Sequence, residues 1–141
     1  MKKGKGKRYV LDTSAIFAYL EDEEGADYIE SLLEQAEKGS AEVLLSFITL
    51  AEVVYITLQE SSEVKALQRL SLMKALSIGI IESSEKLSIA AARLKASHKI
   101  SLADSYIAAL AKNHKGILVH KDPEYDNLGQ MVSVHRLPYK K

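Results

Sequence analysis

Short apolar runs that alternate with helix-like segments constrain this fold more than any other feature of the sequence. We expect strands at residues 8–11, 43–48, 78–81, 117–119 and 132–134. These runs are continuous in hydrophobicity, which indicates strands that are buried on both faces, as in a parallel sheet. The helices between the strands supply the crossover connections that such a sheet needs. The sequence therefore predicts an α/β fold in which helices cover both faces of a mostly parallel sheet.

The segments between the runs have helical periodicity. In residues 26–37, Ile29, Leu32, Leu33 and Ala36 are spaced as one apolar face of a helix. We expect further helices at residues 14–20, 49–59, 62–76, 85–97 and 101–112. A chain of 141 residues fits one domain. We assign residues 8–141 to that domain and residues 1–7 to a basic, flexible arm.

Composition excludes several classes of protein. There is no cysteine, which excludes a disulfide framework, a thiolate zinc site and a cysteine nucleophile. No apolar run approaches the roughly 18 residues of a membrane span, and no secretory signal follows the basic start, so we expect a cytoplasmic protein. The arm either attracts nucleic-acid phosphates or is a solubilising terminus.

Four acids stand near the predicted carboxyl ends of the strands or at helix starts. Asp12 follows the first strand, and Asp122 follows the fourth. Glu52 and Asp104 each lie in the first turn of a predicted helix. In an open α/β sheet, ligands bind in the crevice outside the carboxyl ends of the strands. We therefore expect these acids to face one crevice.

Helix capping is the alternative explanation for each acid. Either Asp12 or Ser14 caps the first helix. Thr49 and Glu52 form a T-x-x-E capping box, Ser101 and Asp104 the related S-x-x-D pattern, and Asp122 precedes a proline in the way that a cap does. Capping accounts for each acid singly, but it does not explain why all four are expected at the same edge of the sheet.

Four carboxylates at one edge of a sheet repel one another, and a hard divalent cation relieves that repulsion. Helix N-termini offset it by only about 0.3–1 kcal/mol each. Carboxylate oxygens suit Mg²⁺ or Mn²⁺. Such an ion activates water and stabilises the leaving oxygen in phosphodiester hydrolysis. The sequence thus indicates a metal-dependent nuclease.

Four ordered segments of the sequence resemble the motifs of PIN domains. Val10–Ile16 resembles the opening strand and D-T/S-S motif, and Ile48–Val53 resembles the helix start with the second acid. Ile100–Ala108 resembles the S-L-x-D-A/S-x-I-A segment, and Ile117–Tyr125 resembles L-V-T-x-D-x-x-F. The resemblance extends from about residue 8 to residue 137, and its strength lies in the order of the motifs.

The resemblance implies a three-layer α/β/α sandwich and a Mg²⁺- or Mn²⁺-dependent endoribonuclease, commonly the VapC-type toxin of a toxin–antitoxin pair. It implies that the protein cuts RNA to 5′-phosphate and 3′-hydroxyl ends, forms a homodimer and binds a small antitoxin through its acidic groove. Asp12, Asp104 and Asp122 would hold the metal. Glu52 would orient water or bind a second metal. The supporting residues would be Thr13, Ser14, Ser101, His120 and Asp126.

Three positions depart from the family pattern. His120 stands where Thr or Ser is common, so it either binds substrate phosphate or weakens the site. Tyr125 replaces a common Phe. Asp126 is a second candidate for the fourth acid, although Asp122 is favoured because it follows the strand closely.

The alternative function is a PIN-like RNA- or protein-binding module with little nuclease activity. Structure-specific DNA nucleases of related fold usually carry more acids and longer insertions. Catalysis by the four histidines is disfavoured because none pairs with a recognisable nucleophile. No G-x-S-x-G elbow or P-loop is present. The RNA target and the number of metal ions stay open.

Overall fold

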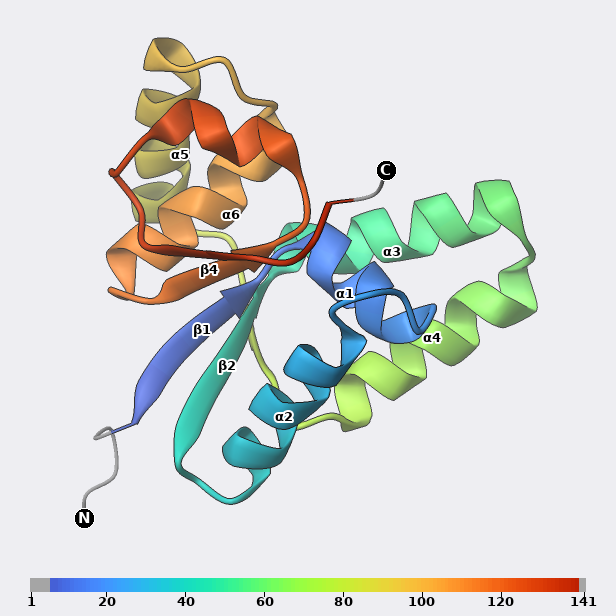
Figure 1. Cartoon of the computed structure of the whole chain (residues 1–141). Helices are drawn as coiled ribbons and strands as arrows, with labels where there is room; N and C mark the ends of the chain where they lie inside the picture. The colour runs from blue at the N-terminus through green and yellow to red at the C-terminus, as the bar shows by residue number, and fades with distance from the viewer. Residues whose placement is uncertain (1–5, 140–141) are drawn as a thin grey trace.

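A five-stranded, entirely parallel sheet forms the centre of the computed structural model, which describes residues 6–139. The strand order is β3-β2-β1-β4-β5. Each adjacent pair is parallel. The prediction of an α/β fold with a parallel sheet between two helical layers is confirmed (Figure 1). The strands are β1 (Lys7–Leu11), β2 (Ala41–Ser46), β3 (Gly79–Ile81), β4 (Ile117–His120) and β5 (Val134–Arg136).

Two apolar clusters pack on opposite faces of the sheet. Neighbouring residues of one strand belong to different clusters: Val10 joins one, while Tyr9 and Leu11 join the other. Helices α5 (Glu85–Ser97) and α6 (Leu102–Asn113) pack on the face that contains Val10. Helices α1 (Thr13–Leu20) and α2 (Ala26–Glu37) pack on the other. Burial on both faces accounts for the continuous hydrophobicity of the strands.

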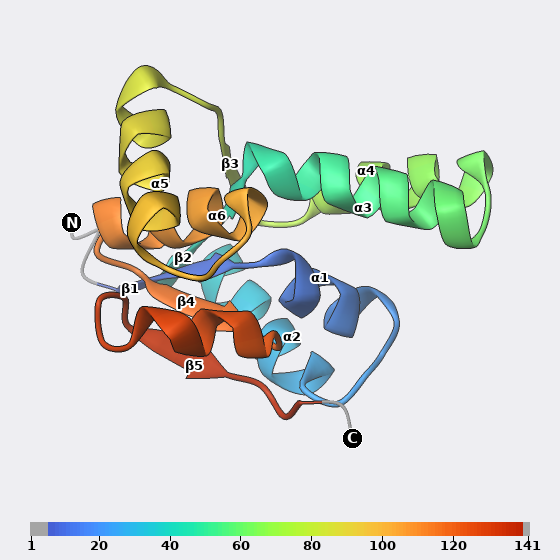
Figure 2. The same cartoon turned by 90° about the horizontal axis from the view of Figure 1, so that it is seen from above.

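Helices α3 (Phe47–Glu60) and α4 (Glu63–Ala75) form a hairpin that extends well beyond the sheet in Figure 2. Its inner residues include Val53 and Met73, which are buried in the core. Its outer surface keeps several large apolar side chains in solvent. These are Tyr55, Leu58, Val64, Leu67 and Leu72.

The predicted boundary between the second strand and the next helix is wrong. The strand was expected to reach residue 48, but β2 ends at Ser46 and α3 begins at once. The Ser46 hydroxyl accepts the backbone N–H of Ile48 and caps the helix. Thr49 therefore lies inside the first turn, and the T-x-x-E capping box does not form. Hydrophobicity alone does not separate a strand end from an apolar first turn.

The last strand also lies later than the sequence indicates. It was expected at residues 132–134, but β5 covers Val134–Arg136. Val132 is buried against the core instead. Because Val132 is apolar and buried, its sequence looks like that of a strand although it lies outside β5.

Most of the basic arm expected at residues 1–7 lies outside the described residues, and Lys7 already belongs to β1. Within residues 6–139, no helix is long and apolar enough to cross a membrane.

Candidate metal centre in an acidic groove

The strand order creates a switch point between β1 and β4. From β1 the chain builds outward through β2 to β3, then returns to place β4 on the other side of β1. The loops after β1 and β4 therefore leave the sheet in opposite directions, and a crevice opens between them. Asp12 directly follows β1, and Asp122 lies just beyond the end of β4.

Three of the four predicted acids meet at this crevice. Asp12, Asp104 and Asp122 each offer a carboxylate oxygen, and these oxygens lie within 4.8 Å of one another. Asp104 reaches the crevice from the first turn of α6, where Ser101 caps the helix by accepting the Asp104 N–H. The architecture thus joins residues from both ends of the described chain in one carboxylate cluster.

Asp12 is both a helix cap and a member of the cluster. Its Oδ1 accepts the backbone N–H of Ala15 at 2.9 Å, which caps α1. The Ser14 hydroxyl lies 2.7 and 2.9 Å from the two carboxylate oxygens. Only 2% of Asp12 is exposed. Burial raises its pKa to about 7, against the lowering effect of the Ser14 and Ala15 hydrogen bonds.

Asp104 is held by a buried phenol. The Tyr125 hydroxyl donates to Asp104 Oδ1 at 3.1 Å. Burial raises the pKa of Asp104, and the hydrogen bond with Glu124 and the charges of Asp122 and Asp12 raise it further. Asp12 and Asp104 therefore both have raised pKa values. A cation bound between them would favour their charged forms and lower these pKa values.

Asp122 is half-buried and caps the short 3-10 helix Pro123–Leu128. Its Oδ1 accepts the Glu124 N–H at 2.9 Å. Its own backbone N–H donates to Nδ1 of His120 at 3.2 Å. His120 is 1% exposed, so its ring is buried beside this turn. The capping pattern that the sequence showed at Asp122 is present.

Glu52 lies near the cluster but is not part of it. The Thr13 hydroxyl donates to Glu52 Oε1 and also lies 3.2 Å from the Thr49 hydroxyl. Glu52 and Thr13 both line the same groove as the three aspartates. The arrangement holds one further carboxylate beside the cluster.

Asp126 is not part of the carboxylate cluster. It is exposed and accepts the Tyr139 hydroxyl at 3.3 Å, and it is absent from the groove lining. Of the two acids that the sequence left as alternatives, the structure groups Asp122 with Asp12 and Asp104.

Sequence reasoning missed Glu124 and Lys121 as groove residues. Glu124 accepts the Ser101 N–H at 3.1 Å and joins the 3-10 helix to the start of α6. The hydrogen bonds of Glu124 with Asp104 and Ser101 lower its pKa. Its neighbour Tyr125 was noted only as a change from Phe, and its hydroxyl is the feature that reaches Asp104. The sequence D-P-E-Y at residues 122–125, just after an apolar strand, was the signal that could have identified Glu124 and Tyr125 as neighbours of the cluster.

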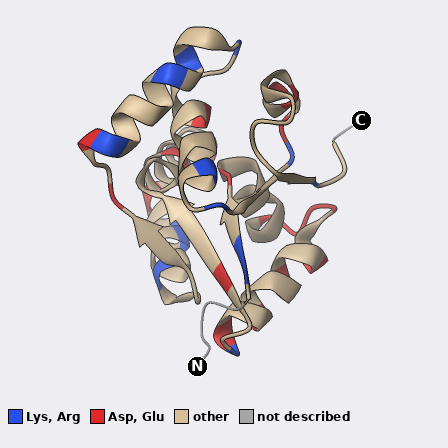
Figure 3. Cartoon of the chain, turned by 90° about the vertical axis from the view of Figure 1, so that its left-hand side faces the viewer, with Lys and Arg blue, Asp and Glu red and all other residues tan. Residues whose placement is uncertain are grey.

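The groove around the cluster has a volume of about 650 Å³ and is strongly acidic. Among the described side chains that line it, Lys121 carries the single positive charge. Basic residues are scattered over several elements, rather than forming one band, in the view of Figure 3. The lining carboxylates are Asp12, Glu21, Glu23, Glu52, Glu60, Asp104, Asp122 and Glu124.

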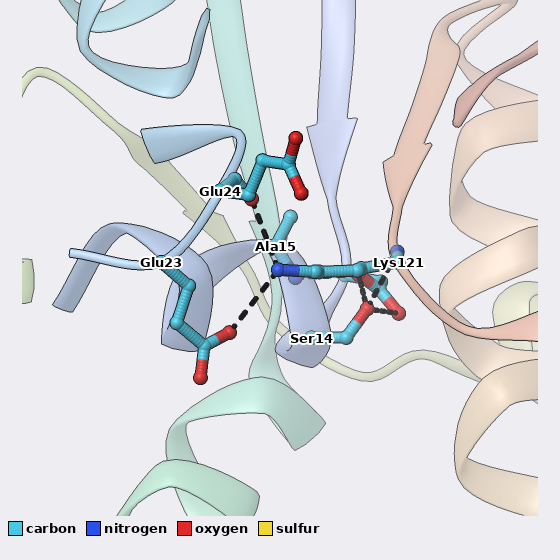
Figure 4. A network of polar contacts seen from close by, with 6 residues as sticks. Ser14, Ala15, Glu23, Glu24 and Lys121 are labelled. Atoms are coloured by element: carbon cyan, nitrogen blue, oxygen red, sulfur yellow. Dashed lines mark hydrogen bonds and ion pairs between the residues drawn. The ribbon is translucent and has the colours of Figure 1, made fainter. Parts of the chain in front are cut away.

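Lys121 is turned toward the loop between α1 and α2. Its Nζ donates to the Glu24 carbonyl at 3.0 Å and lies 3.4 Å from Glu23 Oε1 (Figure 4). Its backbone N–H donates to the Ser14 hydroxyl at 2.8 Å. The side chain is only 5% exposed. Lys121 thus connects Ser14, which holds the Asp12 carboxylate, to the loop between α1 and α2.

The donor set fits a small divalent cation. Oxygens around an octahedral Mg²⁺ or Mn²⁺ are about 3–4 Å apart, given bond lengths near 2.1 Å. The three aspartate oxygens lie within 4.8 Å, so a small side-chain movement brings them to that spacing. All three ligands are carboxylates, which hard cations prefer over the nitrogen and sulfur ligands of zinc sites.

The PIN domain family model matches residues 9–130 of this chain. The match includes all four acids that the sequence singled out. Among curated proteins, none matches the chain in sequence.

Solved structures share the fold at low sequence identity. A chain of VapBC2 from Rickettsia felis, bound to a DNA fragment from its promoter, has a TM-score of 0.75 and 18% identity, covering 93% of this chain and 99% of that one. VapBC-5 from Mycobacterium tuberculosis, a member of the VapBC family of toxin–antitoxin systems, has a TM-score of 0.63 and 21% identity, covering 92% and 97%.

The sarcin–ricin loop cleaving toxin VapC20 from Mycobacterium tuberculosis is a third similar structure. Its TM-score is 0.67 at 13% identity, with coverage of 86% of this chain and 95% of that one. In all three comparisons nearly the whole of the other chain is matched, so the similarity concerns the complete fold rather than a shared substructure.

Proposed function

This chain belongs to the PIN domain family, and from that premise we propose that it is a Mg²⁺- or Mn²⁺-dependent endoribonuclease, the toxin of a toxin–antitoxin pair. The observation that carries the proposal is the carboxylate cluster of Asp12, Asp104 and Asp122 at the switch point of the sheet. The toxin VapC20, which shares the fold, cleaves the sarcin–ricin loop and supports RNA as the substrate.

The three aspartates would hold the cation. When bound, such an ion supplies a nucleophilic water near neutral pH and stabilises charge on the scissile phosphate. Glu52 lies beside the cluster and is held by Thr13. Its carboxylate orients the attacking water and accepts its proton.

The hydrolysis breaks the bond between phosphorus and the 3′ oxygen. The water oxygen bonds to phosphorus in line with the leaving 3′ oxygen, which takes up a proton. The products carry 5′-phosphate and 3′-hydroxyl ends. Ser14 and Ser101 support the reaction indirectly, because one holds the carboxylate of Asp12 and the other caps the helix that presents Asp104.

The acidity of the groove supports an antitoxin as a partner. Within residues 6–139, eight carboxylates and one ammonium line it, so a protein segment that carries Lys or Arg would be attracted to it. VapBC-5 belongs to a family of toxin–antitoxin systems, which supports the same partner. We assign the exposed apolar side chains of the α3–α4 hairpin to contact with a second copy of this chain.

Cleavage of a mixed RNA pool tests the proposal. The wild type is incubated with EDTA, Mg²⁺ or Mn²⁺ beside Asp104→Asn and the control Asp126→Asn. Removing an outer-shell partner of a metal ligand already weakens activity by about 10–100-fold, so loss of a ligand should lower the rate by more than about 100-fold. Asp126 lies outside the groove lining, and its variant should cleave like the wild type.

Product ends and the control variant separate the alternatives. We expect 5′-phosphate ends in the presence of metal and no products with EDTA. Products with 2′,3′-cyclic phosphates would overturn the mechanism, because they arise when the 2′-hydroxyl attacks instead of water. A folded wild type that binds metal but cleaves no RNA would favour the non-catalytic binding module.

A further inference from the structure

His120 is buried and contacts Asp122, a member of the carboxylate cluster. It is the last residue of β4 and is 1% exposed. Its backbone carbonyl accepts the N–H of Leu137, which fixes the strand on the side of β5. The imidazole is absent from the groove lining. It therefore acts on the site only through the residues that it touches.

One such residue is Asp122. The backbone N–H of Asp122 donates to Nδ1 of His120 at 3.2 Å. This hydrogen bond closes a tight turn at the point where β4 ends and the 3-10 helix begins. The carboxylate of Asp122 then caps that helix through the Glu124 N–H. The direction in which Asp122 leaves the strand is thus fixed from both sides.

A second such residue is Tyr125. The two ring centroids lie 4.8 Å apart, with the planes tilted by 51°. Tyr125 is 2% exposed, and its hydroxyl donates to Asp104. The imidazole therefore packs against the ring that holds the second acid, while its nitrogen holds the backbone of the third.

We propose that His120 is a positioning residue that sets the spacing of Asp122 and Asp104 for a divalent cation, through its hydrogen bond to the Asp122 amide and its contact with Tyr125. The inference rests on the proposed function, because it presumes that the cluster binds metal. It assigns His120 a role other than a phosphate contact. A side chain with an acceptor in the place of Nδ1 is what the position requires.

Matched variants isolate the acceptor. Asn and Leu have the same branched shape, but only Asn offers an acceptor where Nδ1 stands. His120→Asn and His120→Leu lose the same ring contact with Tyr125, so they differ chiefly in the hydrogen bond to Asp122. Thr and Val form a second matched pair of smaller volume. The measurement is the Mn²⁺ dissociation constant by titration calorimetry or by electron paramagnetic resonance of free Mn²⁺.

We expect His120→Leu to weaken Mn²⁺ binding about 10-fold or more relative to His120→Asn, since outer-shell partners contribute about 10–100-fold to metal affinity. The melting temperatures of the two variants, measured in EDTA, should be close. The Val and Thr variants should show the same order, with Thr the tighter binder. If one pair does not fold, the other decides.

Equal Mn²⁺ affinities within a folded pair would overturn the role of His120 and leave the nuclease proposal intact. A wild type that binds no Mn²⁺ at millimolar concentration would overturn both. A loss of affinity that only follows a lower melting temperature in EDTA would mark His120 as structural and also contradict the proposal.

Discussion

At the scale of single residues, capping a helix does not remove an acid from the carboxylate cluster. The sequence presents each acid as either a helix cap or a ligand. Asp12 and Asp122 cap helices with one oxygen and still bring a carboxylate oxygen to the cluster. A cap fixes the side-chain rotamer, which is also what a preorganised ligand needs. The ordinary explanation of each acid is therefore part of the geometry of the site.

The pH dependence of stability follows from the buried carboxyls. An unfolded Asp loses its proton near pH 4, while burial raises the pKa of native Asp12 to about 7. Between these values the unfolded state binds fewer protons, so the free energy of unfolding of the metal-free protein falls as pH rises. The slope is about 1.4 kcal/mol per pH unit for Asp12. Asp104, whose pKa is also raised, adds to it.

Chemical denaturation in EDTA from pH 4.5 to 8 measures this slope for the wild type and Asp12→Asn. Asn caps helices as well as Asp does, so the variant removes the ionisation and keeps the cap. We expect a shallower slope and a more stable protein at pH 7.5. Identical slopes for the two proteins would show that Asp12 ionises normally in the folded state.

At the scale of elements, one residue after β4 links three parts of the groove. The backbone of Lys121 holds Ser14, and its ammonium holds the loop between α1 and α2. Periodicity predicted the flanking helices well, because their apolar faces are regular. It did not predict this link, because a lysine in a sequence gives no sign of the distant carbonyl that it will reach.

Lys121→Met should free the loop at residues 21–25 while preserving the backbone hydrogen bond to Ser14. Hydrogen exchange measured by mass spectrometry should be about 10-fold faster in peptides that contain this loop, which corresponds to about 1.4 kcal/mol of lost local stability. Lys112→Met, an exposed position on α6, serves as the control. Unchanged exchange in the loop would mean that Glu23 and Glu24 are held by other contacts.

The start of α3 shows where local prediction stops. The segment from Val43 to Ile48 is apolar except for Ser46, and a single serine inside such a run does not show whether it is a strand residue or a helix cap. The cap became visible only once the sheet had fixed the end of β2. The caps Ser62, Ser84 and Ser101 follow loops, and there a polar residue precedes a periodic segment, so the starts of these helices are easier to predict.

At the scale of the whole molecule, the sequence predicted the layers but not, by itself, the strand order. Continuous apolar strands and intervening helices are enough for a parallel sheet between helical layers. The placement of β4 beside β1, rather than beside β3, depends on long-range packing that no local sequence pattern shows. The switch point between β1 and β4 is what places Asp12 beside Asp122, so the site depends on the part of the fold that is hardest to predict.

Metal binding should stabilise the folded protein by mass action, because the cluster exists only in the native state. At a metal concentration of 100 times the dissociation constant, the gain is about 2.7 kcal/mol, or about 10 °C in melting temperature for a chain of this size. Differential scanning fluorimetry with Mg²⁺, Mn²⁺ or EDTA measures it. Asp104→Asn should lose the shift, whereas Asp126→Asn should keep it. A shift that persists in Asp104→Asn would place the ion elsewhere.

The α3–α4 hairpin should be the contact between two copies of the chain. Leu67 is 52% exposed in the single chain, so Leu67→Glu should hardly change the stability of the monomer but should break an apolar interface. Sedimentation velocity should give a dimer for the wild type and a monomer for the variant. Ile89→Glu on α5, with 45% exposure, is the matched control. A dimer with a dissociation constant of about 1 μM would be well populated at tens of micromolar. A wild type that is monomeric at that concentration would refute this assignment.

The position of the cluster at the switch point also bears on how the protein is made. Asp12 is synthesised before β4, which is translated only after the strands β1 to β3 and the helices α1 to α6. Until β4 inserts beside β1, Asp12 has neither the carboxylate of Asp122 beside it nor the backbone amide of Lys121 that holds Ser14. A nascent chain still short of this strand lacks the complete cluster. For a chain proposed to cut RNA, this order of assembly would keep the ribosome and message that produce it out of reach of a complete site until β4 has been made and inserted.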